Sequence, residues 1–118
     1  MTVTASPAGM TAWDHASLVR SEQGTRTMLT VVGDLDYACA GRFATAVATV
    51  AADGTDVVLD MAGVAFMDSA GLDAIDRVRR FFEILGLALV VLSPPLPIHR
   101  SLGLGHLDGL IEQAEATG

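Results

Sequence analysis

One stretch decides the fold of this chain: Val57-Val58-Leu59-Asp60-Met61-Ala62-Gly63-Val64-Ala65-Phe66-Met67-Asp68-Ser69-Ala70-Gly71-Leu72. Residues 57–59 form a short apolar run with two β-branched side chains, which is typical of a strand buried on both faces. Gly63 predicts a turn. Asp68 and Ser69 predict the start of a helix, because their side-chain oxygens accept hydrogen bonds from the free backbone N–H groups of a helix N-terminus. The stretch therefore predicts a strand, a turn and a helix.

The helix that starts here is predicted to run over Ser69–Leu85. Its apolar residues recur every three or four positions and share one face, as on the core side of an amphipathic helix: Leu72, Ile75, Val78, Phe82 and Leu85. The other face carries the i,i+4 pairs Asp73–Arg77 and Asp76–Arg80, each worth roughly 0.2–0.5 kcal/mol. These charges therefore need no functional explanation.

The rest of the chain alternates between strand and helix patterns. A polar link containing Gly24 predicts a hairpin between strands at 17–21 and 26–32. The later elements are a helix at 38–52, a strand at 87–92, a helix at 96–102 and an edge strand or turn at 107–111. Strand–helix–strand units of this length pair in parallel with right-handed crossovers.

The predicted fold is therefore a single α/β domain. Its sheet is mixed and mostly parallel, is opened by the N-terminal hairpin, and has helices packed on it. We expect residues 13–111 to form this domain, residues 1–12 to be a disordered N-terminus, and residues 112–118 to be a short tail. Trp13 is expected to cover one end of the core.

The composition excludes several classes of function. The chain has 118 residues, 14 acidic against seven basic side chains, and a net charge of −7. This balance argues against binding to nucleic acid or to an anionic membrane surface. It suits a partner with a basic patch, although solubility alone would also explain it. No apolar run reaches the ~20 residues that span a bilayer, and the N-terminus has no features of a signal peptide.

The basic residues and the cysteine exclude further mechanisms. All seven basic residues are Arg, which excludes mechanisms that need Lys, such as the P-loop and Schiff bases. Cys39 is the only cysteine, so it forms no internal disulfide and a reducing cytoplasm is the expected location. A small helix-face residue is the simple explanation of Cys39, and a redox role is the alternative.

An enzyme is not indicated. The sequence around Ser69 lacks the first Gly of the Gly-x-Ser-x-Gly motif, and a Ser nucleophile without a base is inert. His15, His99 and His106 are scattered, have no evident partner and lack metal-ligand spacing. We therefore expect no catalytic residue, no metal and no cofactor. A response-regulator receiver with Asp60 as its acceptor has a similar architecture, but it needs a Lys near its end.

The candidate site lies where the strands end. In an open α/β sheet, ligands and partners meet the carboxyl ends of the strands, where helix N-termini gather. Asp36 and the Asp68-Ser69 pair should both lie at that edge. Asp36 precedes the helix at 38–52, where its carboxylate can cap or favour the helix N-terminus. The missing side chain of Gly71 allows close approach, either of a partner backbone or of the sheet itself.

Several blocks of the sequence together resemble the STAS domain, the family of anti-sigma factor antagonists and sulphate-transporter cytoplasmic tails. The matching residues are Gly33-Asp34-Leu35-Asp36, Val57-Val58-Leu59-Asp60, Phe66-Met67-Asp68-Ser69-Ala70-Gly71-Leu72 and residues 104–110. In stand-alone members an ATP-dependent anti-sigma kinase phosphorylates the Ser that follows this Asp. The resemblance thus implies phosphorylation at Ser69.

The resemblance implies a partner-binding surface made of Asp36, Asp68, Ser69, Ala70 and Gly71. Its partner would be an anti-sigma factor with serine kinase activity, and a phosphatase would reset Ser69. The chemistry agrees, because a helix N-terminus can hold a phosphate without unfolding. Asp68 would orient the Ser69 hydroxyl or accept a hydrogen bond from the kinase. Two alternatives remain: Ser69 is only a helix cap, or the chain is a STAS binding module that is not phosphorylated.

Overall fold

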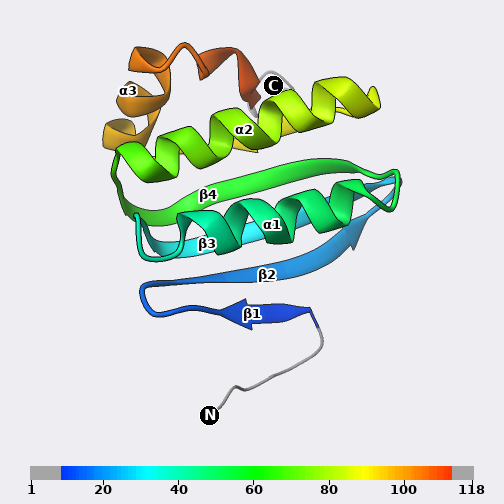
Figure 1. Ribbon diagram of the computed structural model, residues 1–118, viewed down its shortest axis with the longest axis horizontal. Helices are drawn as coiled ribbons and strands as arrows, with labels where there is room; N and C mark the ends of the chain where they lie inside the picture. Colours follow the sequence, from blue (N-terminus) through cyan, green and yellow to red (C-terminus); the bar gives the residue numbers. More distant parts are fainter. Residues whose placement is uncertain (1–8, 113–118) are drawn as a thin grey trace.

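The computed structural model describes residues 9–112, which form one six-stranded sheet and three α-helices (Figure 1). The strands are β1 (Met10–Ala12), β2 (Ala16–Gln23), β3 (Arg26–Leu35), β4 (Asp56–Met67), β5 (Leu89–Leu92) and β6 (Ile111–Glu112). The helices are α1 (Ala40–Ala51), α2 (Ser69–Leu85) and α3 (Leu96–Leu104), and a short 3-10 helix, η1 (Asp108–Leu110), precedes β6.

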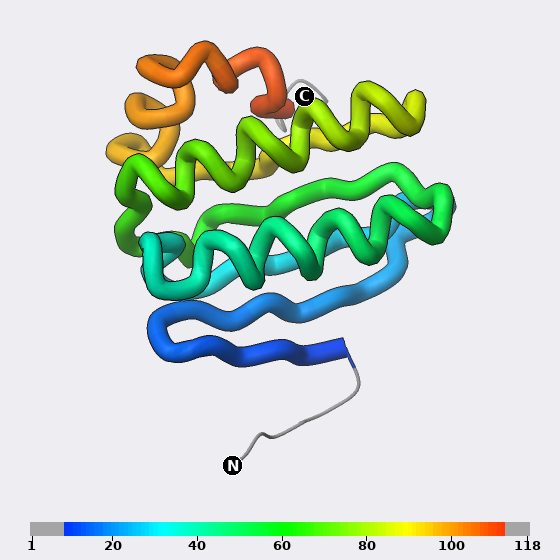
Figure 2. Tube along the Cα trace, in the orientation of Figure 1, coloured from blue at the N-terminus to red at the C-terminus, as the bar shows by residue number. Residues whose placement is uncertain are grey.

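The strand order is β1-β2-β3-β4-β5-β6. The pairs β1–β2 and β2–β3 are antiparallel, whereas β3–β4, β4–β5 and β5–β6 are parallel. α1 and α2 contact each other and lie side by side over one face of the sheet (Figures 1 and 2). The predicted fold class, a mixed and mostly parallel α/β sheet opened by a hairpin, is confirmed.

The core lies between the sheet and these two helices. Residues 57–59 are all at most 1% exposed, so the prediction of a strand buried on both faces is confirmed. The apolar stripe of α2 is buried at Ile75, Val78 and Phe82, whereas Leu85 is 43% exposed. Trp13 packs against the core as predicted, with its ring edge-on to Phe43 at a centroid distance of 6.5 Å.

The predicted turn at Gly63 is wrong, because β4 continues through it to Met67. The pairing with β3 shifts register twice, after Asp60 and after Val64, so that each shift adds an extra residue to β4. Such a β-bulge resets which side chain faces inward. Only every third residue is then buried: Met61, Val64 and Met67.

Both ends of the described chain depart from prediction. Met10–Ala12 were expected to be disordered, but they pair with β2 as an edge strand. Glu112 was assigned to the tail, but it belongs to β6. Of the predicted edge strand or turn at 107–111, residues 108–110 form the 3-10 helix η1 and only Ile111 lies in β6. Residues 1–8 and 113–118 lie outside the described residues.

The third helix continues past Gly103 to Leu104. Within 9–112, no helix is long and apolar enough to cross a membrane.

Candidate functional site

Three loops meet at the carboxyl end of the parallel strands, at the left of Figure 1. β3 and β4 end side by side, since Leu35 and Met67 are register partners. The loop between β1 and β2 joins them, because the Asp34 N–H donates to the His15 carbonyl at 2.8 Å. The predicted placement of Asp36 and Asp68 at one edge of the sheet is therefore confirmed.

Asp68, one of the two predicted capping residues, is the N-cap of α2. Its Oδ1 accepts a hydrogen bond from the Gly71 N–H at 2.9 Å, and its Oδ2 accepts one from the Tyr37 N–H at 3.0 Å. The first bond satisfies a free donor of the helix terminus. The second joins the end of β4 to the loop after β3. Both carboxylate oxygens thus serve the fold, and within 9–112 no hydrogen bond joins Asp68 to the Ser69 hydroxyl.

Ser69 is the first residue of α2 and is exposed. The alternative in which Ser69 is the helix cap is wrong, because Asp68 fills that position. The Ser69 hydroxyl is therefore not needed to hold the helix end, and a partner can reach it. Ala70 beside it is partly buried against the core.

Asp36 is buried, with 12% of its side chain exposed. Its Oδ2 lies 2.8 Å from His15 Nδ1, and its Oδ1 accepts from the Ala38 N–H at 3.1 Å. The second contact is an Asx-turn just before α1. The predicted helix cap is therefore wrong in detail, because the N-cap of α1 is Cys39, which makes no side-chain capping bond.

The contact between Asp36 and His15 shifts the pKa of both side chains. The hydrogen bond from His15 lowers the pKa of Asp36, and the same bond raises the pKa of His15 above its usual 6.5. His15 was predicted to have no partner, and this was wrong. The two residues are 21 positions apart, and no pattern in the sequence joins them. For His99 and His106 the described residues provide no side-chain hydrogen bond.

Gly71 is explained by packing inside the protein. A Cβ at this position would clash with the Leu35 carbonyl oxygen and would lie 2.8 Å from Met67 Cγ. The first turn of α2 can therefore approach the end of β3 only if this residue has no side chain. Of the two alternatives for Gly71, the structure supports close packing on the sheet.

Cys39 is fully buried, and its Sγ lies 3.4 Å from the Asp34 carbonyl oxygen. Burial raises the pKa of this thiol, which disfavours the reactive thiolate. The side chain is thus a small core residue at the start of α1. Among residues 9–112 no three His, Cys, Asp or Glu side chains are grouped so that they could hold a metal ion.

The edge also carries exposed large side chains that were not among the predicted site residues. Tyr37 is 80% exposed, Phe66 is 52% exposed and Leu96, the first residue of α3, is 61% exposed. Tyr37 follows β3, Phe66 lies near the end of β4, and Leu96 follows β5. All three therefore lie at the same end of the sheet. Because large aromatic side chains often anchor protein interfaces, Tyr37 and Phe66 extend the candidate surface along this edge.

The geometry defines a small α/β domain whose helix N-terminus presents an exposed serine at the carboxyl edge of a sheet. The family model for the STAS domain matches residues 17–117, so the chain belongs to the STAS domain family. No curated protein sequence matches it.

Three solved proteins are similar in fold. An anti-sigma factor antagonist from Mycobacterium paratuberculosis has a TM-score of 0.71 at 22% identity, covering 85% of this chain and 86% of that one. SpoIIAA from Bacillus, an anti-sigma factor antagonist, has TM-scores of 0.70 unphosphorylated and 0.65 phosphorylated, at 16% identity, covering 85% of this chain and 92% or 96% of that one. The murine anion transporter Slc26a9 has a TM-score of 0.65 at 19% identity, covering 74% of this chain and 16% of the transporter chain. At these identities the likeness concerns the fold.

Proposed function

We propose that this protein is a stand-alone anti-sigma factor antagonist whose binding is controlled by phosphorylation of Ser69. Unphosphorylated, it binds an anti-sigma factor with ATP-dependent serine kinase activity, and the sigma factor is released. The observation that carries the proposal is the exposed Ser69 hydroxyl at the first position of α2, next to an Asp68 that already caps the helix. The match to the STAS family and the fold likeness to antagonists support it.

Phosphorylation changes the surface and leaves the fold intact. A phosphoserine adds about −1.5 to −2 charge at pH 7. The free N–H groups and the partial positive charge of the α2 terminus tolerate that charge. A partner surface that accommodates a neutral hydroxyl next to Asp68 would reject it. A loss of about 3 kcal/mol at this contact lowers affinity more than a hundredfold, which is enough for a binary switch.

The partner surface comprises Asp36, Asp68, Ser69 and Ala70, with Gly71 shaping the backbone beneath them. The protein itself performs no catalysis and needs no cofactor or metal, because the kinase holds the ATP and a phosphatase removes the phosphate. It works in the cytoplasm and regulates sigma-factor-dependent transcription without contacting nucleic acid or a membrane. The net charge of −7 supports a protein partner in place of nucleic acid or a membrane.

A second candidate is a STAS binding module that acts without phosphorylation, in a signalling scaffold or a transport complex. The fold likeness to part of the Slc26a9 anion transporter favours this alternative. The two candidates differ in one respect: in the second, the charge at position 69 has no effect on which proteins bind.

The test uses three baits for affinity capture from the lysate of the native host, read by mass spectrometry. They are the wild type, Ser69→Glu and Ser21→Glu, in which the same charge is placed on an exposed serine of β2. We expect a kinase-like ATPase on the wild-type and Ser21→Glu baits and its loss from Ser69→Glu. Incubation of the captured kinase with ATP should then add one phosphate at Ser69. The same partners on all three baits, with no kinase among them, would exclude the phosphorylation switch. The second candidate, a binding module that is not phosphorylated, would then remain.

A further inference from the structure

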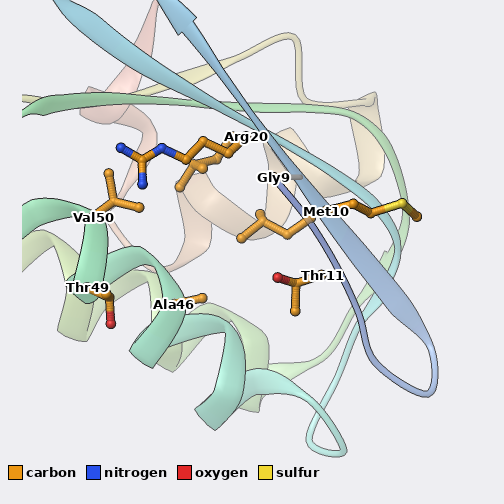
Figure 3. A pocket seen from close by; sticks show the side chains of 9 residues that line it. Gly9, Met10, Thr11, Arg20, Ala46, Thr49 and Val50 are labelled. Carbon is orange, nitrogen blue, oxygen red and sulfur yellow. The ribbon is translucent and has the colours of Figure 1, made fainter. Parts of the chain in front are cut away.

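A continuous hollow crosses the outer surface of α1. Its first part, of about 290 Å³, lies between β1, β2 and α1 (Figure 3), the second, of about 630 Å³, lies over the N-terminal half of α1, and the third, of about 200 Å³, lies between α1 and α2. Thr11 and Ala46 line both the first and the second part. Gly41, Thr45 and Arg77 line both the second and the third. The hollow therefore extends from the edge strand β1 to α2.

The charged side chains that line this hollow are basic, whereas the protein as a whole is acidic. Three of the seven arginines line it, Arg20, Arg42 and Arg77, and no Asp or Glu among residues 9–112 does. The chain as a whole has twice as many acidic as basic side chains. Arg20 and Arg77 each pair with a neighbouring carboxylate, Glu22 and Asp73, whereas Arg42 has no ion pair within residues 9–112. The positive charge therefore centres on Arg42, which favours an anionic ligand at this part of the hollow.

The three guanidinium groups are engaged to different degrees. Arg20 is the most engaged, because its Nε lies 3.2 Å from Glu22 Oε2 and its Nη2 lies 4.0 Å from Asp53 Oδ2. Arg42 Nη2 donates to the Ala38 carbonyl at 2.9 Å, and no carboxylate within residues 9–112 forms an ion pair with Arg42. Arg77 Nε lies 3.1 Å from Asp73 Oδ2, and half of its side chain is exposed. A guanidinium has five N–H donors. Arg42 and Arg77 therefore both keep donors that can bind a carboxylate in the paired geometry that Arg favours.

The hollow also offers apolar contacts. Its first part has a floor of buried side chains, Leu18, Leu29 and Val50, and in Figure 3 the Arg20 side chain extends toward Val50. The partly buried Trp13 ring lines the second part. A ligand that fills the hollow therefore combines negative charge with an aliphatic group.

Gly41 keeps the middle of the hollow open. It lies within α1, where glycine is unfavourable compared with alanine. A Cβ there would meet no atom within 4 Å, so packing inside the protein does not require glycine. Its missing side chain instead leaves room in both the second and the third part of the hollow.

We infer that this hollow binds a short acidic segment of a partner protein, with carboxylates on Arg42 and Arg77 and an aliphatic side chain against Trp13. The open, elongated shape suits an extended chain better than a compact ion. The net charge of −7 opposes approach from a distance, but physiological salt screens that repulsion beyond about 8 Å, whereas the arginines act at contact. The site lies on the outer surface of the helices and does not depend on the state of Ser69.

The test is titration of the full chain with an acetylated, amidated peptide of sequence Glu-Asp-Leu-Asp-Glu, with Gln-Asn-Leu-Asn-Gln as the neutral control. Trp13 is the only tryptophan, so its fluorescence reports on the hollow, and the amide NMR signal of Gly41 provides a second probe. We expect saturable binding of the acidic peptide and at least tenfold weaker binding of the neutral one.

Variants locate the binding site. Arg42→Gln and Arg77→Gln should each weaken binding about tenfold, and Gly41→Leu should block it, with circular dichroism confirming that each variant is folded. Arg100→Gln removes an exposed arginine of α3 that does not line the hollow, and it should leave binding unchanged. Ser69→Glu should also bind normally, which separates this site from the phosphorylation switch.

Several outcomes would overturn the inference. These are no saturable signal, equal binding of the neutral peptide, or equal losses in Arg100→Gln and Arg42→Gln. Displacement of the peptide by an equal concentration of inorganic phosphate would show a site for small anions in place of a site for a protein segment.

Discussion

His15 and Asp36 join two loops that the sequence separates by a whole hairpin. His15 Nδ1 lies 2.8 Å from Asp36 Oδ2, and the His15 carbonyl accepts from the Asp34 N–H at 2.8 Å. Half of the imidazole side chain is exposed, whereas the carboxylate is almost fully buried. The loop between β1 and β2 is thereby fixed against the end of β3, next to the helix terminus that presents Ser69.

This pair should make stability depend on pH in a defined window. The pKa of Asp36 is lowered in the folded protein, so its contribution is present above the ordinary value of 3.8 and is lost as the pH falls through the folded pKa. The pKa of His15 is raised, so its contribution is complete below 6.5 and is lost as the pH rises through the folded pKa. The pair therefore stabilises the fold most between these two values.

Urea unfolding of the wild type and His15→Gln at about pH 5.5 and about pH 8.5 measures this effect. We expect the variant to lose more stability relative to the wild type at the lower pH. His99→Gln, which changes an exposed histidine with no side-chain partner in residues 9–112, is the matched control for loss of an imidazole. A pH-independent effect of His15→Gln would contradict the pair.

Two glycines should respond to alanine in opposite directions. Gly71→Ala places a methyl group against the Leu35 carbonyl and should destabilise the protein by about 1–3 kcal/mol, because a rigid backbone cannot yield as a side chain can. Gly41→Ala places a methyl group in open space and should stabilise α1 by about 0.5–1 kcal/mol. Chemical denaturation of the two variants measures both values. A destabilisation of similar size in both would show that the close approach at Gly71 is not the cause.

The division of roles between Asp68 and Ser69 is also testable. Asp68→Ala removes the cap of α2 and the acceptor for the Tyr37 N–H, and should cost about 1–2 kcal/mol of unfolding free energy. Asp68→Asn keeps one oxygen acceptor and should cost less. Ser69→Ala should cost less than about 0.5 kcal/mol, since an exposed surface hydroxyl holds no part of the helix. Thermal unfolding of the three variants checks this order, and a larger loss in Ser69→Ala than in Asp68→Ala would reverse the assignment.

Local patterns in the sequence were sufficient for the elements that carry the site. The buried run at 57–59, the start of α2 at Asp68-Ser69 and the apolar stripe of α2 each depend on neighbouring residues, so they could be predicted. The β-bulges around Gly63 could not, because an extra residue in β4 is defined only by its register with β3. The contact between His15 and Asp36 likewise exists only after the hairpin has folded. Tyr37 was missed because exposure of a side chain is a property of the whole surface.

The exposed aromatic side chain beside the site should contribute to binding and not to folding. Tyr37 is 80% exposed, so Tyr37→Ala should leave the unfolding free energy within about 0.5 kcal/mol of wild type. If the proposed kinase docks at this edge, the same substitution should weaken its binding by about tenfold or more, as for aromatic anchors in other interfaces. Ile84→Ala is the matched control, because Ile84 is 81% exposed near the opposite end of α2. Calorimetric titration of the captured kinase with both variants should show a loss only for Tyr37→Ala, whereas equal affinities would place the partner elsewhere on the surface.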